Sequence, residues 1–280
     1  MVILGKIKNI IINKIFLRFE LVALAILTVI ACLLYISDVP PVMAQSAAAA
    51  LPDVVIPQSG QRILVFSPHP DDETIGAGGY IAQSIENGAD VRIVLVTDGD
   101  FHGNEDVRYA EFKKATQILG VSGSQLVFLG LPDGKLDKMD PPALYSALQL
   151  QIAQYNPDIV VYPDIRDDNP DHSAIGKMME KILKADPNEI TGYAYLVHYK
   201  LIWPRPRALA PRLNLTPPNR LLNANTSWEK VPLSQTDENL KLAAINTYKS
   251  QLDNPWLHGL LLSSIRRSEL LAVPKNTDTP

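Results

Sequence analysis

The stretch FSPHPDDETIGAGG, residues 66–79, places one histidine and three acidic residues between an apolar run and a glycine-rich segment. The apolar run RILVFS, residues 62–67, is typical of a buried β-strand, and the sequence after the acidic residues has helical spacing. In open α/β sheets, ligands bind beyond the carboxyl ends of the strands. We therefore expect His69, Asp71 and Asp72 to lie at a ligand-binding edge of a sheet.

Strand-like and helical stretches alternate through the following hundred residues. Strands separated by helices of about 10 to 15 residues indicate βαβ units with right-handed crossovers, and the parallel sheet that results is buried on both faces. The sequence thus predicts an α/β, Rossmann-like fold with a mainly parallel sheet flanked by helices. The strand-like runs are residues 62–67, 91–97, 126–130 and 159–162.

The second half of the chain is less regular. Residues 193–203 resemble another strand, and the proline-rich residues 204–220 predict an irregular connection. Helical spacing returns at residues 237–252 and 259–272. Because no internal repeat or second boundary is visible, we predict one domain over residues 61–275.

The N-terminus has the features of an export signal or a membrane anchor. Four basic residues precede or enter a nearly apolar stretch at residues 16–36, whose uninterrupted part, Leu21–Ile36, has 16 residues. That length is close to both a signal-peptide core and the ~20 residues of a spanning helix, so both interpretations stay open. In either case the positive end stays inside and the rest of the chain is exported.

The residues after the apolar run bear on how this segment is processed. Val42-Met43-Ala44 resembles a cleavage site, whereas Cys32, in a possible lipoprotein signal, is followed by further apolar residues. We assign residues 1–44 to the signal peptide or anchor and residues 45–60, which are rich in alanine and proline, to a linker. If the segment is retained, it is the part of the chain that contacts a membrane.

Charge and cysteine content exclude several kinds of site. Residues 45–280 contain 22 basic and 28 acidic residues, a net charge of −6, so a nucleic-acid partner is not expected. Cys32 is the only cysteine, and the exported part therefore has no disulfide and no cysteine nucleophile. Any metal must be held by histidine and carboxylate side chains.

A second strand end supplies the remaining ligand. Residues 164–172 follow the run at 159–162, so His172 can meet His69 and Asp72 at the same edge of the sheet. Two histidines, one carboxylate and a water form an open, catalytic type of zinc site. Asp71 cannot point the same way as Asp72, which leaves it free to take a proton from that water.

The unbroken string His-Pro-Asp-Asp-Glu at residues 69–73 resembles the zinc-dependent N-deacetylases of the PIG-L/LmbE type. Further similar pieces are TDGD (97–100), LGV (119–121), FLGLPDGKL (128–136), NPDH (169–172), LVH (196–198), YKSQ (248–251) and RRSE (266–269). The resemblance implies Zn²⁺ on His69, Asp72 and His172, Asp71 as general base, and removal of an N-acetyl group from an N-acetylated sugar or glycoconjugate.

One position departs from the family pattern. The family usually has histidine three places before the last zinc ligand, where this chain has Asn169. An amide can donate a hydrogen bond to an oxyanion but cannot carry a proton. Either the rate is lower, Asp71 moves the proton alone, or His198 takes the place of the missing histidine.

Two further residues are candidates for substrate binding. The resemblance implies that Arg108 binds polar groups of the substrate, although it could instead pair with Glu105 or Glu111 on a helix. Asp98 follows the second strand and is expected near the substrate. A small molecule or glycan is thus the expected partner, and the alternative function is a non-catalytic glycan- or surface-binding module that keeps the zinc site.

Overall fold

The computed structural model describes residues 17–30, 43–101, 103–188, 190–200, 203–222 and 226–274. The chain divides into two compact units, residues 1–42 and residues 43–280.

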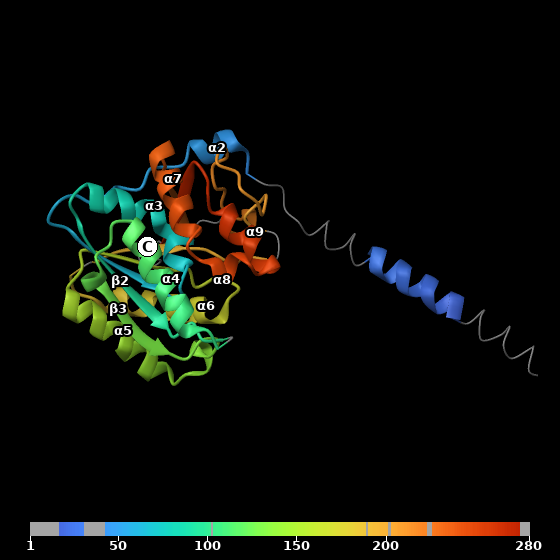
Figure 1. Cartoon of the computed structure of the whole chain (residues 1–280), viewed down its shortest axis with the longest axis horizontal. Coiled ribbons are helices and arrows are strands. Elements are labelled where there is room, and N and C mark those ends of the chain that lie inside the picture. The colour runs from blue at the N-terminus through green and yellow to red at the C-terminus, as the bar shows by residue number, and fades with distance from the viewer. Residues whose placement is uncertain are drawn as a thin grey trace, which may run out of the picture. The chain divides into compact units, whose positions relative to one another are not determined.

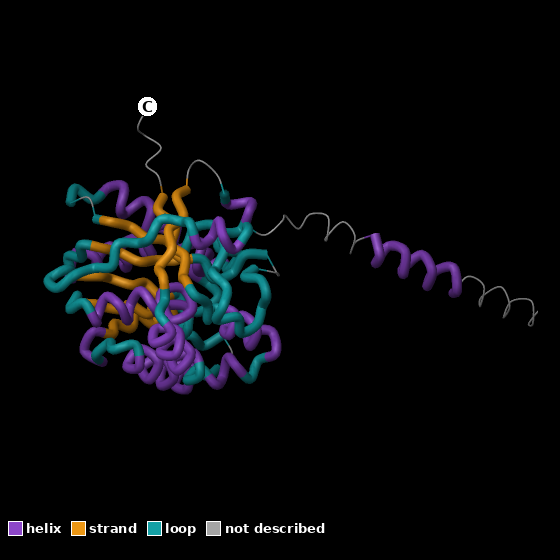
Figure 2. Tube along the Cα trace, turned by 90° about the horizontal axis from the view of Figure 1, so that it is seen from above, coloured by secondary structure: helices purple, strands orange, loops and turns teal. Residues whose placement is uncertain are grey.

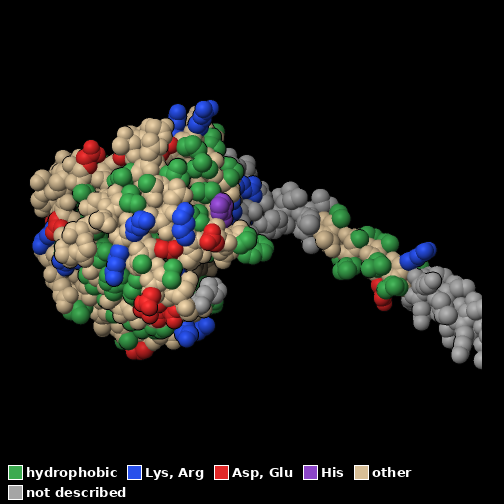
Figure 3. Space-filling view, in the orientation of Figure 1, with side chains coloured by type: hydrophobic (Ala, Val, Ile, Leu, Met, Phe, Trp, Pro, Cys, Tyr) green, Lys and Arg blue, Asp and Glu red, His purple; other side chains and the backbone are tan. Residues whose placement is uncertain are grey.

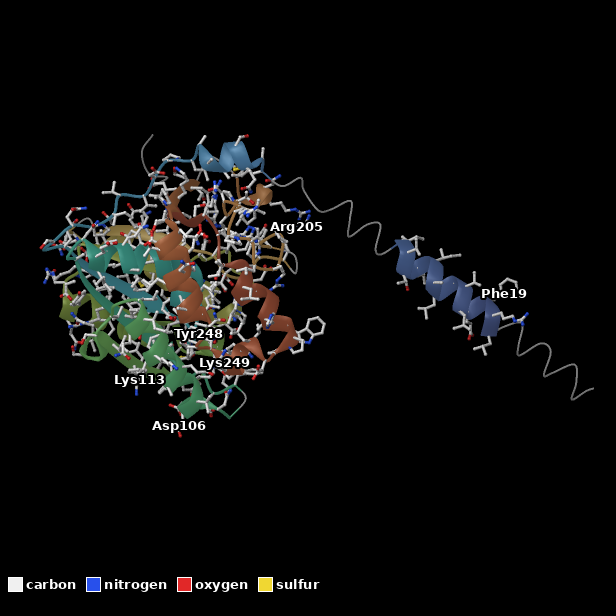
Figure 4. The ribbon with its side chains drawn as sticks, turned by 45° about the horizontal axis from the view of Figure 1, so that its top comes forward. Phe19, Asp106, Lys113, Arg205, Tyr248 and Lys249 are labelled. Atoms are coloured by element: carbon white, nitrogen blue, oxygen red, sulfur yellow. The ribbon has the colours of Figure 1, made fainter. Side chains whose placement is uncertain are left out.

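The described part of the first unit is a helix over residues 17–30. Its side chains are mostly hydrophobic and exposed (Figure 3), and Phe19, which projects from it in Figure 4, is 71% exposed. Among the described residues, no helix has both the length and the apolar character needed to cross a membrane. Residues 1–16 and 31–42, on which most of the predicted signal or anchor falls, lie outside the described residues.

The second unit is built on a seven-stranded sheet with the order β3-β2-β1-β4-β5-β7-β6. Strands β1 to β5 run parallel, and β7 and β6 continue the sheet in antiparallel fashion. The α/β fold with a mainly parallel sheet, predicted from the sequence, is confirmed. The strands are β1 (Arg62–Ser67), β2 (Asp90–Thr97), β3 (Leu126–Leu131), β4 (Ile159–Pro163), β5 (Thr191–Tyr195), β6 (Thr226–Pro232) and β7 (Ser268–Pro274).

Helices cover both faces of this sheet (Figures 1 and 2). The helices are α2 (Gln45–Ala49), α3 (Asp72–Glu86), α4 (Glu105–Ile118), α5 (Pro141–Tyr155), α6 (Pro170–Ala185), α7 (Gln235–Ile245), α8 (Lys249–Leu252) and α9 (Pro255–Ser263). Short 3₁₀ turns span Gly123–Gln125, Leu136–Lys138 and Asn219–Leu221. Helix α7 packs beside α3, although the two are far apart in sequence (Figure 1).

The core divides into two layers according to the alternation of side chains along the strands. In β1, Ile63 and Val65 point into the layer beneath α3, α4, α7 and α9, whereas Leu64 and Phe66 point into the layer beneath α5 and α6. All four side chains are fully buried. A strand covered on both faces must be apolar throughout, which is why RILVFS shows no polar alternation.

The C-terminal region differs from the prediction. A helix over residues 259–272 was expected, but α9 ends at Ser263 and β7 begins at Ser268, so that part of the prediction is wrong. Strand β7 pairs with β5 on one side and β6 on the other, and Leu270, Leu271 and Ala272 are buried. A short apolar run that is buried on both faces has no period by which a strand can be distinguished from a helix.

The segment predicted as a linker, residues 45–60, lies in the same compact unit as the sheet. Asp53 forms a parallel bridge with Lys230 of β6, and the N–H of Val54 donates to the Lys230 carbonyl at 2.8 Å. The side-chain amide of Gln45 both donates to and accepts from the backbone of Asn214. Contacts of this segment with the outer strand therefore extend the folded unit to residues before 61.

Candidate active site

Three side chains meet beyond the carboxyl ends of β1 and β4, one from the turn before α3 and one each from the first turns of α3 and α6. Nδ1 of His69 lies 3.0 Å from Oδ2 of Asp72, and Nε2 of His172 lies 2.9 Å from the same oxygen. The two ring nitrogens are 3.3 Å apart. His69, Asp72 and His172 are 8%, 2% and 0% exposed, respectively. The structure thus brings together the three residues expected to bind metal.

The secondary structure explains how these residues reach one point. Strand β1 ends at Ser67, and the chain turns through residues 68–71 so that Asp72 opens helix α3. His172 is the third residue of α6, which follows β4. Because β1 and β4 are parallel neighbours, their carboxyl ends and the helices that follow them lie at the same edge of the sheet.

The donor atoms fit a small divalent cation. In a tetrahedral zinc site with bonds of about 2.0–2.1 Å, the ligand atoms lie about 3.3 Å from one another. The three distances among His69, Asp72 and His172 are 2.9, 3.0 and 3.3 Å. Two imidazole nitrogens and one carboxylate oxygen also form the ligand set of open zinc sites. The arrangement is therefore a candidate metal centre.

Carboxylates contact the outward-facing nitrogens of both histidines. Nε2 of His69 lies 3.1 Å from Oδ2 of Asp171 and 3.2 Å from Oδ1 of Asp133. Nδ1 of His172 lies 3.3 Å from Oδ2 of Asp167. Such contacts fix the tautomer and orientation of a ligand histidine and increase its basicity.

The charges of the cluster shift its pKa values in a consistent way. Burial opposes ionisation of His172, but Asp72 and Asp167 overcome it and raise the pKa of His172 to about 9. The pKa of His69 is also raised well above its usual value, because its carboxylate neighbours outweigh burial. Against the same burial effect, the two histidines hold the pKa of Asp72 well below its usual range.

Asp71 lies beside this cluster and is 7% exposed. Its backbone φ is +136°, a conformation that non-glycine residues rarely adopt and that often marks a functional site. Burial first, and then the charge of Asp72, raise the pKa of Asp71 well above its usual value, although Arg108 acts in the opposite direction. A carboxylate with a raised pKa next to a metal site is suited to accept a proton.

Hydrogen bonds to the side chain of Glu73, which is fully buried, stabilise the turn that holds Asp71. Oε2 of Glu73 accepts hydrogen bonds from the Ser67 hydroxyl at 2.9 Å and from the Asp71 N–H at 3.3 Å. Its Oε1 accepts from Thr74 at 2.6 Å and from the Tyr248 hydroxyl at 2.5 Å. Tyr248, labelled in Figure 4, follows α7 and thereby ties the C-terminal region to this turn.

Arg108 lies close to the site but is 7% exposed. Its guanidinium donates to the carbonyls of Gly99 and Pro70 at 3.1 and 3.0 Å. It also lies 3.5 Å from Asp133 and 3.8 Å from Asp71. These contacts link the loop after β1 to the loop after β2 and place the guanidinium beside the carboxylates of Asp71 and Asp133. Within the described structure, Arg108 therefore pairs with site residues in place of Glu105 or Glu111.

Asp98 shapes a loop of the site. Its Oδ1 accepts hydrogen bonds from the backbone N–H of Asp100 at 3.0 Å and of Asp133 at 3.1 Å. No contact between Asp98 and the two ligand histidines is seen in the described part of the chain. Asp98 is therefore linked to the cluster indirectly, because it binds the backbone of Asp133, whose side chain contacts His69.

Asn169 occupies the N-cap of α6. Its side-chain oxygen accepts from the N–H of Asp171 at 2.9 Å, while its own N–H donates to Asp167 at 2.9 Å. The carbonyl half of the amide thus satisfies one of the unpaired donors of the helix. The position at which the family usually has histidine is used here as a helix cap.

His198 lies on the other side of His172. The two rings are in an edge-to-face arrangement with centroids 4.8 Å apart. Nδ1 of His198 lies 3.2 Å from Oδ1 of Asp167, and the side chain is 29% exposed. His198 is therefore a half-buried histidine that is oriented by a carboxylate, at the edge of the candidate metal centre.

Two contributors to the site were not identified from the sequence. Asp133 and Asp167 both contact the candidate ligand histidines, but the sequence pattern indicated no role for either of them. Asp133 lies within the family-like piece at residues 128–136, after a third strand whose carboxyl end faces the same edge. Its position after a parallel strand was the signal that could have identified it.

Comparison with known proteins agrees with this site. Residues 64–183 match the protein family described as PIG-L, GlcNAc-PI de-N-acetylase. The matched region begins in β1 and ends in α6, and it contains all three candidate ligands.

Two curated relatives carry related descriptions. The chain is 28% identical over 153 residues to a probable N-acetyl-alpha-D-glucosaminyl L-malate deacetylase 2 of Bacillus anthracis, covering 50% of this chain and 66% of that protein. It is 30% identical over 128 residues to the diacetylchitobiose deacetylase of Thermococcus kodakarensis, covering 41% and 46%. The chain thus spans less than two thirds of the length of these relatives.

Solved structures show the same fold. The conserved protein TT1542 from Thermus thermophilus superposes with a TM-score of 0.57 at 22% identity, covering 76% of this chain and 94% of that one. GalB, the 4-carboxy-2-hydroxymuconate hydratase from Pseudomonas putida KT2440, superposes with a TM-score of 0.54 at 18% identity, covering 79% and 99%. Because a hydratase shares it, the fold alone does not define the reaction. The family match over residues 64–183, together with deacetylases among the relatives, confirms the resemblance to the PIG-L family that was found in the sequence.

Proposed function

We propose that this protein is a zinc-dependent hydrolase that removes an N-acetyl group from an N-acetylated sugar or glycoconjugate. The observation that carries the proposal is the convergence of His69, Asp72 and His172 within 3.3 Å of one another, with the buried carboxylate of Asp71 beside them. The descriptions of the relatives as deacetylases of acetylated amino sugars support the substrate class.

The three ligand residues would hold the cation through Nδ1 of His69, Oδ2 of Asp72 and Nε2 of His172. When bound, zinc lowers the pKa of a water and polarises a carbonyl oxygen. Asp171, beside Nε2 of His69, and Asp167, beside Nδ1 of His172, would help to orient the two rings so that their other nitrogens face the cation.

Asp71 is assigned as the general base that takes a proton from the attacking water. It is not needed as a ligand, because Asp72 already supplies the carboxylate of the three-residue set. The hydrogen bond from its N–H to Glu73 and the nearby guanidinium of Arg108 hold its unusual backbone conformation and its side chain in place. A fixed orientation is required for efficient proton transfer.

A proton must also reach the leaving amine. Asn169 cannot deliver it, since an amide does not ionise and its oxygen already caps α6. His198 can, because Asp167 orients its Nδ1 while the ring stays half-buried at the edge of the cluster. We therefore assign to His198 the role that the family usually gives to a histidine at position 169.

The experiment that tests the proposal is release of acetate from N-acetylglucosamine conjugates by the full chain. Activity should be lost with a chelator, return with Zn²⁺, and fall in Asp71→Asn. Glycan binding without acetate release by the zinc-loaded protein would instead favour a non-catalytic binding module. Absence of both acetate release and glycan binding would contradict either function.

We also propose that the domain acts outside the cytoplasm, either secreted or tethered to a membrane. The basic residues up to Arg18 and the apolar run Leu21–Ile36 support this proposal. Protease added to intact spheroplasts should degrade the domain or, if the domain is released, the protein should be found in the medium. Protection of the domain until the cells are lysed would contradict export.

A further inference from the structure

Helix α3 is interrupted five residues after the candidate ligand that opens it. Ala77 has φ −145° and ψ 16°, which is not helical, and it forms a kink between two helical segments of α3. The interruption separates a first turn, which carries Asp72 and Glu73, from the longer segment that continues to Glu86. One cause of sharp bends of this kind is a side chain that enters the backbone hydrogen-bond ladder.

A buried ion pair occupies that position. In an uninterrupted helix, the N–H of Gly79 would donate to the carbonyl of Ile75. Here Nζ of Lys241 donates to the Ile75 carbonyl at 2.9 Å, and Oε1 of Glu269 accepts from the Gly79 N–H at 2.6 Å. Nζ of Lys241 donates to Oε1 of Glu269 at 2.5 Å, and Oε2 of Glu269 accepts from the backbone N–H of Tyr80 at 2.9 Å.

The pair comes from elements that the active site does not otherwise use. Lys241 lies on α7 and Glu269 on β7, within the RRSE piece whose role was not evident from the sequence. Both side chains are 1% exposed. A buried ion pair is often no more stabilising than apolar residues of similar volume, so its contribution to folding does not by itself account for it.

Two sets of contacts hold the first turn of α3. The ring of Tyr195 lies against Gly76, so closely that a Cβ there would be 2.3 Å from it. The Lys241–Glu269 pair holds the carbonyl of Ile75 and the N–H groups after the interruption. The direction of this turn determines where the Asp72 carboxylate lies relative to His69 and His172.

We propose that Lys241 and Glu269 are positioning residues, which set the first turn of α3 and thereby the affinity and geometry of the metal centre. The inference rests on the proposed function, because it takes the three-residue cluster to be a metal site. It predicts that the pair acts on metal binding through Asp72, without touching the metal or the substrate.

The test uses Co²⁺ as a spectroscopic replacement for zinc in the full chain. Lys241→Met removes the donor at similar length, and Glu269→Gln leaves one acceptor while replacing the other with an NH₂ group. Each variant should bind Co²⁺ at least about 10-fold more weakly than the wild type, as found when groups that orient metal ligands are lost, and should show altered visible absorption bands. Their kcat should fall more than KM changes.

Two control variants separate this effect from loss of stability. Asp53→Asn removes the ion pair with Lys230 on the outer strand, and Leu148→Ala truncates a buried side chain of α5, which carries no site residue. Both should bind Co²⁺ within about twofold of the wild type, even though Leu148→Ala lowers the melting temperature.

The outcomes are distinguishable. Unchanged Co²⁺ affinity in folded Lys241→Met and Glu269→Gln, beside a wild type that binds the metal, would overturn the positioning role and leave the proposed function intact. A wild-type chain that binds no Co²⁺ or Zn²⁺ would overturn both. Failure of both variants to fold would also overturn the inference, because the pair would then be needed for the whole fold and not for one turn.

Discussion

Nε2 of His172 lies 2.9 Å from Oδ2 of Asp72, which joins the first turn of α6 to the first turn of α3. His69, from the turn before α3, contacts the same oxygen at 3.0 Å. Two imidazole nitrogens and one carboxylate oxygen thus converge from the ends of two strands. The first turn of a helix positions Asp72, and carboxylates contact the other ring nitrogens of His69 and His172. A site with this construction depends equally on each of its three members.

The first prediction follows from that equality. His69→Ala, Asp72→Ala and His172→Ala should each abolish stoichiometric zinc binding, since an open site has only three protein ligands. Metal content measured after dialysis should fall from about one zinc per chain to near zero. His258→Ala is the control, because His258 is exposed and contacts the carbonyl of Leu252. Full zinc content in the ligand variants would contradict the assignment.

The second prediction concerns pH. Asp72 and Asp167 raise the pKa of His172 to about 9, so this histidine of the metal-free site is mainly protonated at pH 7, and the pKa of His69 is raised in the same direction by its carboxylate neighbours. A cation binds only the neutral rings, and binding must therefore release protons. Zinc affinity should increase with pH and level off only above about pH 9. Calorimetry in buffers of different ionisation enthalpy measures this release, and a value near zero at pH 7 would contradict it.

The third prediction separates Asp71 from the ligands. Asp71→Asn preserves the shape of the side chain but removes the basic carboxylate. Zinc should remain bound, whereas turnover should fall by about 10²-fold or more. Metal content and the rate of acetate release, measured on the same sample, test both statements. Turnover near that of the wild type would show that another group is the base.

The sequence predicted the candidate site better than it predicted the C-terminal half of the fold. His69, Asp71 and Asp72 follow an apolar strand within a few residues, so their place at the sheet edge follows from local pattern alone. Asp133 and Asp167 contact the histidines because the loops after β1, β3 and β4 converge in the folded chain. The periodicity of the sequence within each segment does not indicate these contacts between segments. Strand β7 was assigned to a helix because Leu270, Leu271 and Ala272 are buried on both faces and show no alternation.

Gly76, which follows the string of candidate ligands, packs closely against a neighbouring ring and gives a fourth prediction. A Cβ on Gly76 would lie 2.3 Å from the buried ring of Tyr195, whose hydroxyl is fixed by the Phe66 carbonyl. A Cβ on Gly78 would be no closer than 3.5 Å to any neighbour. Gly76→Ala should therefore destabilise the protein by about 1–3 kcal/mol, the usual cost of overpacking.

Gly78→Ala is the matched control for that variant. It should change stability by less than about 1 kcal/mol, with a gain expected because alanine restricts the unfolded chain. Urea unfolding of both variants gives the comparison. Equal stability of Gly76→Ala and Gly78→Ala would show that the Tyr195 ring can move aside, and that the first turn of α3 is less firmly held than its contacts indicate.

The last prediction decides between Asn169 and His198 as the group that serves the leaving amine. His198→Ala should reduce turnover by about 10²-fold with zinc retained, because it removes the only ionisable side chain of the pair. Asn169→Ser keeps a hydroxyl that can cap α6 and should change turnover little, whereas Asn169→His should lose about 1 kcal/mol of stability through the missing cap. Acetate release, metal content and unfolding midpoints of the three variants test this. If Asn169→His instead raised turnover while His198→Ala had no effect, the family's usual position would still serve the amine, and Asp167 would orient His198 for some purpose other than proton transfer.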